Sequence, residues 1–290
     1  MKWNLWARVT AEFLGTAFLV ASVVGSGIMA ERLANGNMAL ALLANTIATG
    51  AALVALILAF GPISGAHFNP VVSLADAMEG GLSWSHAAGY IGAQLFGGIG
   101  GSIAAHAMFG LALVSRSHHA RGGPAQFLSE FIATFGLLSV IWGCSRSRAS
   151  VVPFAVGSYI AAAYWFTAST SFANPAVTIA RSLSDTFAGI RPNDVPLFIV
   201  AQVGGGVAAT FLFRWLIPGL PSRATNAFVF RGCCPAVEGT THYESALSVQ
   251  RFQQVQSPRH TPGLIEAKRR ATRELPGAQQ RRRRPPLEDR

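Results

Sequence analysis

Two asparagines, Asn69 and Asn174, each stand directly before a proline among small and apolar residues. Proline is favoured at the first position of a helix, and an asparagine before it can cap that helix. The motifs Asn69-Pro70-Val71 and Asn174-Pro175-Ala176 therefore predict two short helices, over about 69–79 and 174–185. The partial positive charge at such helix starts repels cations, while asparagine amides can donate to the oxygen of an uncharged solute.

Three ionisable residues lie close to these motifs or deep in apolar sequence. Glu12 and Glu130 interrupt two long apolar stretches, and His67 precedes Asn69 by two residues. A carboxylate inside a membrane indicates function by default, so a proton relay is one interpretation. Support of the neighbouring loops through hydrogen bonds is the other. No nucleophile is paired with a base in these stretches, and the sequence does not predict an enzyme, a cofactor or a metal site.

The composition indicates a membrane protein. Of 290 residues, 51% are hydrophobic and 12% are charged, about half the charged fraction of soluble domains. Apolar stretches of sufficient length predict six spans near 9–29, 38–60, 86–109, 126–143, 151–168 and 195–217. Each short Asn-Pro helix is too short to cross alone, and a loop at membrane depth must line a cavity or be buried in protein.

An internal repeat relates the two halves of this predicted all-α membrane protein. Three blocks recur in the same order: Glu-Phe-Leu-Gly-Thr near Glu12 and Glu-Phe-Ile-Ala-Thr near Glu130, then the two Asn-Pro motifs, then two Ala-Gln dipeptides followed by paired glycines. Repeat one covers about 8–109 and repeat two about 126–217. Since each contains three full spans, the repeats must be inverted relative to one another, with the site near the midplane.

The remaining residues predict a channel domain over 1–221 and a separate tail over 222–290. The tail has thirteen of the chain's basic residues and six acidic ones, and it lacks apolar periodicity, so it is predicted to be disordered. The positive net charge therefore does not predict a nucleic-acid partner, although a basic run could contact membrane lipid. Cys233-Cys234 has no third ligand for a soft metal. Short-loop Lys and Arg place both termini in the cytoplasm of an inner-membrane protein.

These residues and motifs resemble the major intrinsic protein family, the aquaporins and aquaglyceroporins. The resemblance covers about residues 8–217 and depends on the string from Ser64 to Val71, on Asn174-Pro175-Ala176, and on Glu12 and Glu130. It implies six transmembrane helices, two re-entrant half-helices, one pore per subunit and a homotetramer. It also implies that the two glutamates hold the half-helix loops. Val71 stands where the family usually has alanine.

The departure after the second motif bears on selectivity. Val177 stands where the family nearly always has an arginine of the outer constriction. Carried over by position, the other constriction residues are Thr49, Ser171 and a fifth-span residue, which is either Ala162 or Tyr164. This predicts a wide, uncharged ring in which proton exclusion rests on the helix starts. One turn beyond Val177, Arg181 is either a charge in the outer vestibule or a surface arginine.

The string from Tyr164 to Val177 is similar to that of bacterial aquaglyceroporins associated with arsenic resistance. The resemblance implies passage of arsenite, an uncharged trihydroxide at neutral pH, together with glycerol and water. Three alternatives stay open: an ordinary water or glycerol channel without an arsenic role, an ion-coupled secondary transporter, and an ion channel. Inverted repeats and broken helices are shared by transporters.

Overall fold

The computed structural model describes residues 3–217, which form six long helices, two short helices and two single 3-10 turns. The predicted boundary after Pro221, the tail and Cys233-Cys234 lie outside the described residues. The long helices are α1 (Leu5–Leu33), α2 (Met38–Ser64), α4 (Trp84–Met108), α5 (Pro124–Ser147), α6 (Val152–Phe166) and α8 (Val195–Leu216), and the short ones are α3 (Pro70–Met78) and α7 (Pro175–Arg181).

The predicted class, six spans with two half-helices, is confirmed. Five of the long helices are both long and apolar enough to cross a membrane, with the 3-10 turn at Ala149–Val151 extending α6. The sixth, α4, is as long as the others, but its sequence is rich in glycine and contains glutamine and histidine. Helix α7 ends at Arg181, earlier than expected, because Ser182 hydrogen-bonds back to the Ile179 carbonyl and the chain turns.

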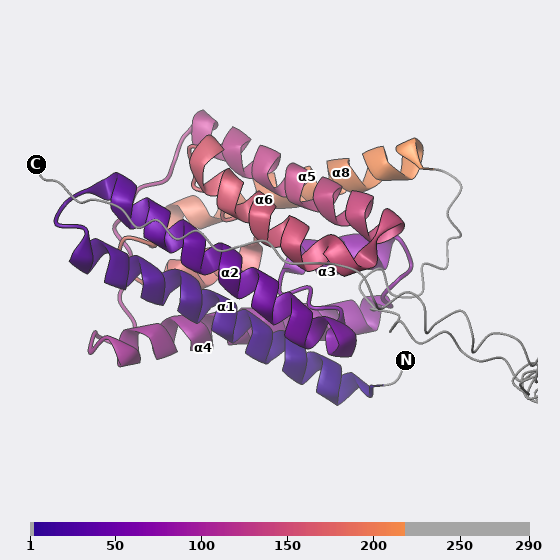
Figure 1. The fold of residues 1–290 in the computed structure, drawn as a ribbon, viewed down its shortest axis with the longest axis horizontal. Coiled ribbons are helices and arrows are strands. Elements are labelled where there is room, and N and C mark those ends of the chain that lie inside the picture. The colour runs from indigo at the N-terminus through magenta and orange to yellow at the C-terminus, as the bar shows by residue number, and fades with distance from the viewer. Residues whose placement is uncertain (1–2, 218–290) are drawn as a thin grey trace, which may run out of the picture. The chain divides into compact units, whose positions relative to one another are not determined.

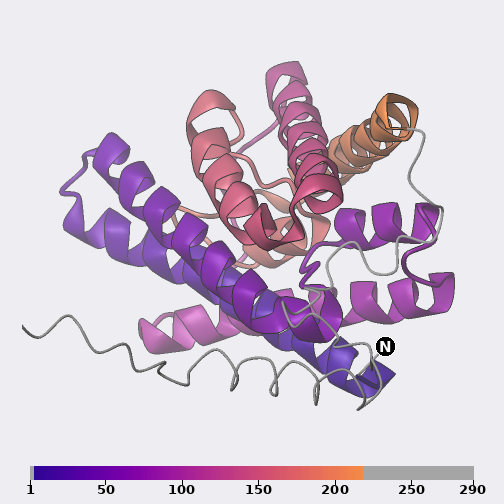
Figure 2. The same ribbon diagram turned by 45° about the vertical axis from the view of Figure 1, so that its right-hand side comes forward.

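The two repeats form matching groups of helices. Helix α1 packs on α2 and α4, and α5 packs on α6 and α8 in the same relation. In both views α1, α2 and α4 lie together on one side, and α5, α6 and α8 lie on the other (Figures 1 and 2). Helices α2 and α6 meet between the groups, and the half-helices α3 and α7 contact each other. We call the end where α1 begins the terminal end, and the opposite one the distal end.

Glycines permit the closest helix contacts. A Cβ atom on Gly97 of α4 would lie 2.3 Å from the carbonyl oxygen of Phe13, and one on Gly101 would lie 2.2 Å from that of Ala17. Gly205 of α8 approaches the Phe131 carbonyl equally closely, at 2.3 Å. Because the contacting atoms are backbone atoms, they cannot rotate away. Small residues thus set the distance between α1 and α4, as is typical of membrane helices.

Gly97→Ala is expected to destabilise the protein by about 1–3 kcal/mol, the usual effect of overpacking. The added methyl group must separate α1 from α4, since the obstructing atom belongs to the Phe13 backbone. Gly92→Ala is the matched control on the same helix, because no atom lies within 4 Å of its added Cβ. Thermal unfolding in detergent checks the prediction, and equal melting temperatures for the two variants would contradict it.

Candidate functional site

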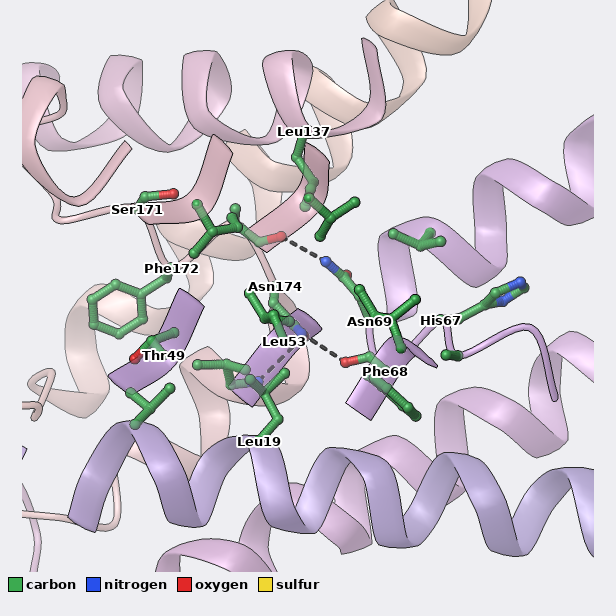
Figure 3. Close-up of a pocket in the computed structure, with 18 of the residues that line it drawn as sticks. Leu19, Thr49, Leu53, His67, Phe68, Asn69, Leu137, Ser171, Phe172 and Asn174 are labelled. Atoms are coloured by element: carbon green, nitrogen blue, oxygen red, sulfur yellow. Dashed lines mark hydrogen bonds between the residues drawn. The ribbon is translucent and has the colours of Figure 1, made fainter. Parts of the chain in front are cut away.

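The two half-helices meet at their N-termini, and each asparagine both caps its own helix and contacts the other loop. Asn69 Oδ1 accepts from the Val71 N–H at 3.0 Å, and Asn174 Oδ1 accepts from the Ala176 N–H at 2.9 Å. The Nδ2 group of Asn69 donates to the Ala173 carbonyl, and that of Asn174 donates to the Phe68 carbonyl, both at 2.7 Å. Figure 3 shows these two bonds crossing between the loops.

Each asparagine amide keeps one hydrogen for another acceptor. A side-chain amide has two N–H donors, and the crossed bond uses one of them. Both asparagines line one cavity, which they share with residues from six helices and both loops. The centre of the cavity therefore carries two donors that are held in place and available to a solute oxygen.

The carboxylate of Glu12 is occupied by four donors. Its Oε1 accepts from the Ser64 hydroxyl at 2.6 Å and the His67 N–H at 3.0 Å. Its Oε2 accepts from the Phe68 N–H at 2.7 Å and from Gln94 at 2.8 Å. These bonds fix the loop before α3, in which Phe68 has a positive φ of 49°.

Glu130 makes the corresponding bonds in the second repeat. It accepts from the N–H groups of Phe172 and Ala173, each at 2.9 Å, and from Gln202 at 2.6 Å. Ala173 has a positive φ of 48°, which costs free energy in a residue other than glycine. Both glutamates are fully buried and hold the loops from which the asparagines project.

The cavity is small and has two unlike sides. It encloses about 60 Å³, enough for a short file of water molecules. The pore loops supply a polar side with the two asparagines, and the long helices supply an apolar wall. Figure 3 shows His67 at one end, Ser171, Phe172 and Thr49 at the other, and the asparagines between them. The wall consists of Leu19, Val23, Leu53, Ile57, Leu137, Ile141, Val152, Val156 and Ile160.

Four of the residues expected at the constriction line the distal part of this cavity: Thr49, Tyr164, Ser171 and Val177. The Tyr164 hydroxyl donates to Thr49 Oγ1 at 3.3 Å, which joins α6 to α2. The Ser171 hydroxyl is buried and has no hydrogen-bond partner among the described residues. Ala162, the other fifth-span candidate, is exposed on the outside of α6 and does not line the cavity.

The remaining motif residues are buried beside the cavity rather than along it. Pro70, Val71, Pro175 and Ala176 form the first turns of α3 and α7. The Val71 side chain does not line the cavity. It occupies space beside α8: a Cβ atom built on Gly206 would lie 2.2 Å from Val71 Cγ1. The larger residue in the first motif is thus accommodated by a glycine on α8.

His67 lines the terminal end of the cavity. Its Nδ1 lies 3.0 Å from the Ser73 hydroxyl and its Nε2 lies 3.6 Å from Asp76. Its ring packs edge-on against Tyr90, with centroids 5.4 Å apart. Asp76 occupies the position in α3 that Arg181 occupies in α7, but Asp76 does not line the cavity and reaches it only through its contact with His67.

Arg181 is buried and lines the cavity, so it is not a surface arginine. Its Nε donates to the Ala188 carbonyl, and its guanidinium carbon lies 3.4 Å from the centroid of the Phe172 ring. The distal end of the cavity therefore carries a charge at Arg181, which agrees with the vestibule alternative, while Thr49, Tyr164, Ser171 and Val177 carry none. Val177 leaves the first turn of α7 without a charged side chain at this position, and Arg181 places a positive charge one turn later.

Arg121, in the segment between α4 and α5, reaches the same ring. Its guanidinium carbon lies 5.1 Å from the Phe172 centroid, and Nε donates to the Gly189 carbonyl at 2.8 Å. NH1 donates to the Ser169 carbonyl at 3.2 Å, so this side chain joins the loops on both sides of α7. Burial lowers the pKa of Arg121, and the charge of Glu130 acts in the opposite direction.

Asp194 holds the backbone of this arginine. Its Oδ2 accepts from the Arg121 N–H at 2.8 Å, and its Oδ1 pairs with Arg191 at 2.9 Å. Asp194 therefore fixes where the Arg121 side chain begins.

A family model described as Major intrinsic protein matches residues 1–171 and 146–245. The matched segments include both Asn-Pro motifs and both supporting glutamates, whose paired geometry is described above. The chain belongs to the major intrinsic protein family. Members of this family are membrane channels for small uncharged solutes and not enzymes, so this multi-pass protein is a passive solute channel.

Similar proteins come from several kingdoms. Over 216 residues the chain is 55% identical to "Aquaglyceroporin AqpS" of Rhizobium meliloti (strain 1021), which covers 74% of this chain and 92% of that protein. It is 30% identical to "Probable aquaporin AqpM" of Archaeoglobus fulgidus over 74% of this chain and 99% of that one. The solved aquaglyceroporin of Plasmodium falciparum has the same fold, with a TM-score of 0.60 at 21% identity, over 74% and 98% of the two chains.

Sequence reasoning missed two channel residues of this major intrinsic protein. Phe172 was not singled out, although it precedes Asn174 by the same two residues that separate His67 from Asn69. That equivalence was the available signal. Arg121 was not singled out either, because its segment carries no motif that predicts contact with a pore loop 48 residues away in the chain.

Proposed function

We propose that this channel conducts small uncharged hydroxylated solutes, namely glycerol, arsenite as the trihydroxide, and water. One observation carries the proposal: two fixed amide donors in the middle of a small cavity face an otherwise apolar wall. A solute with hydroxyl groups on one side and carbon or a compact centre on the other suits such a surface. An ion would lose its hydration without receiving counter-charges there.

We propose Thr49, Tyr164, Ser171 and Val177 as the constriction. Three of these side chains carry hydroxyl groups, which suit a hydroxylated solute. The Ser171 hydroxyl is enclosed and has no protein partner among the described residues, so it must turn toward the cavity to meet a solute. Valine at 177 leaves more room than the long side chain that the family usually has at this position. Both features support passage of solutes larger than water.

The proposal that arsenite is among the conducted solutes rests on chemical similarity. The trihydroxide is uncharged at neutral pH and resembles glycerol in size and hydroxyl display. The string from Tyr164 to Val177 resembles that of aquaglyceroporins associated with arsenic resistance. Arsenite made inside a cell by arsenate reduction would leave down its own gradient, without coupling to an ion.

Stopped-flow light scattering of proteoliposomes tests the proposal with water, glycerol and arsenite side by side. All three solutes are expected to enter faster than into empty vesicles, in proportion to concentration and independently of a proton gradient. Water and glycerol entry without arsenite entry would reduce the function to an ordinary glycerol channel. Saturation together with proton dependence would instead identify an ion-coupled carrier, the alternative that the inverted repeats leave open.

We also propose a homotetramer in a bacterial inner membrane with both termini in the cytoplasm. Arg146, Arg148 and Arg214 near the terminal end support this orientation, while Arg116 and Arg121 at the distal end oppose it. Labelling of single cysteines placed in the loop after α1 and the loop after α5 in intact cells tests it. Reaction of the first but not the second is the expected result. Crosslinking in membranes tests the tetramer.

Thr49→Phe is expected to lower glycerol and arsenite permeability at least about tenfold. Thr49 is buried and lines the cavity opposite Tyr164, so a phenyl ring there must occupy space that a solute needs and must break the bond to the Tyr164 hydroxyl. The matched control is Ile47→Phe on the same helix, which is exposed away from the cavity. Equal solute flux in the two variants would show that Thr49 lies off the pathway.

A further inference from the structure

The distal mouth of the cavity holds two arginines around one aromatic ring. The guanidinium carbons of Arg181 and Arg121 lie 3.4 and 5.1 Å from the centroid of the Phe172 ring. Phe172 is buried, lines the cavity and is fixed from another side by Phe198, whose ring meets it edge-on at 5.2 Å. The face of an aromatic ring attracts a cation but does not neutralise it.

Neither arginine side chain forms a direct ion pair. Among residues 3–217, no carboxylate forms an ion pair with either guanidinium. The hydrogen-bond partners of both side chains are instead neutral groups: the carbonyls of Ala188, Gly189 and Ser169, and more distantly the Thr170 hydroxyl. The mouth therefore carries two positive charges without a direct ion pair, and the carboxylate of Glu130 attracts both of them only from beyond ion-pair distance.

The contacts also leave donors free on the arginine that lines the cavity. Arg181 is 2% exposed, and among the described residues only its Nε has a hydrogen-bond acceptor. Its two terminal nitrogens have no acceptor among the described residues and are not fully enclosed by protein atoms, so they retain contact with the cavity. A solute oxygen can accept from them, whereas a proton or metal cation meets their charge.

We propose that Arg181, supported by Phe172 and Arg121, is the cation barrier of this channel. It supplies, one turn farther out on α7, the positive charge that the family usually has at the position of Val177. This inference rests on the proposed function, because it requires a conducting pore. A fixed charge in a site of low dielectric repels a monovalent cation by several times the thermal energy, whereas neutral solutes are not repelled. The barrier adds to that of the two half-helix starts.

The test measures proton entry into proteoliposomes of the full chain with an enclosed pH dye, under an imposed potassium-diffusion potential. Glycerol permeability is measured on the same vesicles, and the ratio of proton to glycerol permeability is compared between variants. Arg181→Gln is expected to raise this ratio about 100-fold, Arg121→Gln about tenfold, and Arg181→Lys less than about threefold because the charge remains.

Arg32→Gln is the matched control. Arg32 also lies at the distal end, stacks on an aromatic ring (Phe109, 5.1 Å) and donates to a backbone carbonyl, but it is exposed and off the cavity. Its ratio should equal that of the wild type. Ratios within about twofold of wild type for Arg181→Gln and Arg121→Gln would overturn the inference.

Two further outcomes are informative. If Arg181→Gln fails to insert, Arg121→Gln decides alone, since its guanidinium does not line the cavity: an unchanged ratio refutes the barrier and a raised ratio supports it. A wild-type chain without glycerol permeability would refute the proposed function instead, which separates the two failures.

Discussion

Val177→Arg is expected to lower glycerol and arsenite permeability at least about tenfold, and water permeability by less than about threefold. Val177 is buried and lines the cavity one turn before Arg181. A guanidinium there would fill part of a cavity of about 60 Å³. A tenfold effect corresponds to about 1.4 kcal/mol in the barrier, a modest requirement for a bulky charged group in such a space.

Val177→Leu separates size from charge in this experiment. Leucine adds bulk without charge or hydrogen-bond donors, so we expect a smaller loss of glycerol flux than with arginine. Stopped-flow measurements on both variants and the wild type give the comparison. If arginine at this position leaves glycerol and arsenite fluxes intact, Val177 does not belong to the constriction.

Glu130→Ala is expected to abolish solute flux and to lower stability by at least about 3 kcal/mol. The change leaves the N–H groups of Phe172 and Ala173 and the amide of Gln202 without their buried acceptor. Each unsatisfied buried donor costs about 1–3 kcal/mol. The loss corresponds to roughly 10 °C in melting temperature for a chain of this size, measurable in detergent.

Glu31→Ala is the control for Glu130→Ala. The Glu31 carboxylate also accepts a backbone N–H from a loop, that of Phe187 at 3.2 Å, but it is exposed. Its replacement should change stability by less than about 1 kcal/mol. A stable, conducting Glu130→Ala protein would show that the loop before α7 keeps its conformation without the Glu130 carboxylate. Normal stability with flux that has lost a proton dependence present in the wild type would favour the proton-relay interpretation.

The number and arrangement of the helices were largely predictable from the apolar stretches and the internal repeat of the sequence. The apolar stretches located the spans because a bilayer sets a minimum helix length, and the two Asn-Pro motifs located the half-helices because proline fixes a helix start. The repeat predicted two equivalent halves, and the shared offsets from Asn69 and Asn174 matched the glutamate contacts in both loops.

The distal mouth was less predictable because it depends on loops whose lengths vary. The sequence left Ala162 and Tyr164 as alternatives for the fifth-span position, because a difference of two residues in the length of a loop rotates a helical position by about 200°. The structure has Tyr164 on the cavity and Ala162 outside. Arg121 depends on how a segment without secondary structure folds over α7, which no local pattern encodes.

The crossed bonds of Asn69 and Asn174 bear on how the two repeats come together in the bilayer. Each asparagine gives its amide hydrogen to a carbonyl of the opposite repeat, at Ala173 and Phe68. A chain severed between α4 and α5 would give two fragments, each with an unpaired donor and acceptor at membrane depth. Such fragments should be degraded when each is synthesised alone and should accumulate when both are synthesised together. Each repeat therefore assists the folding of the other.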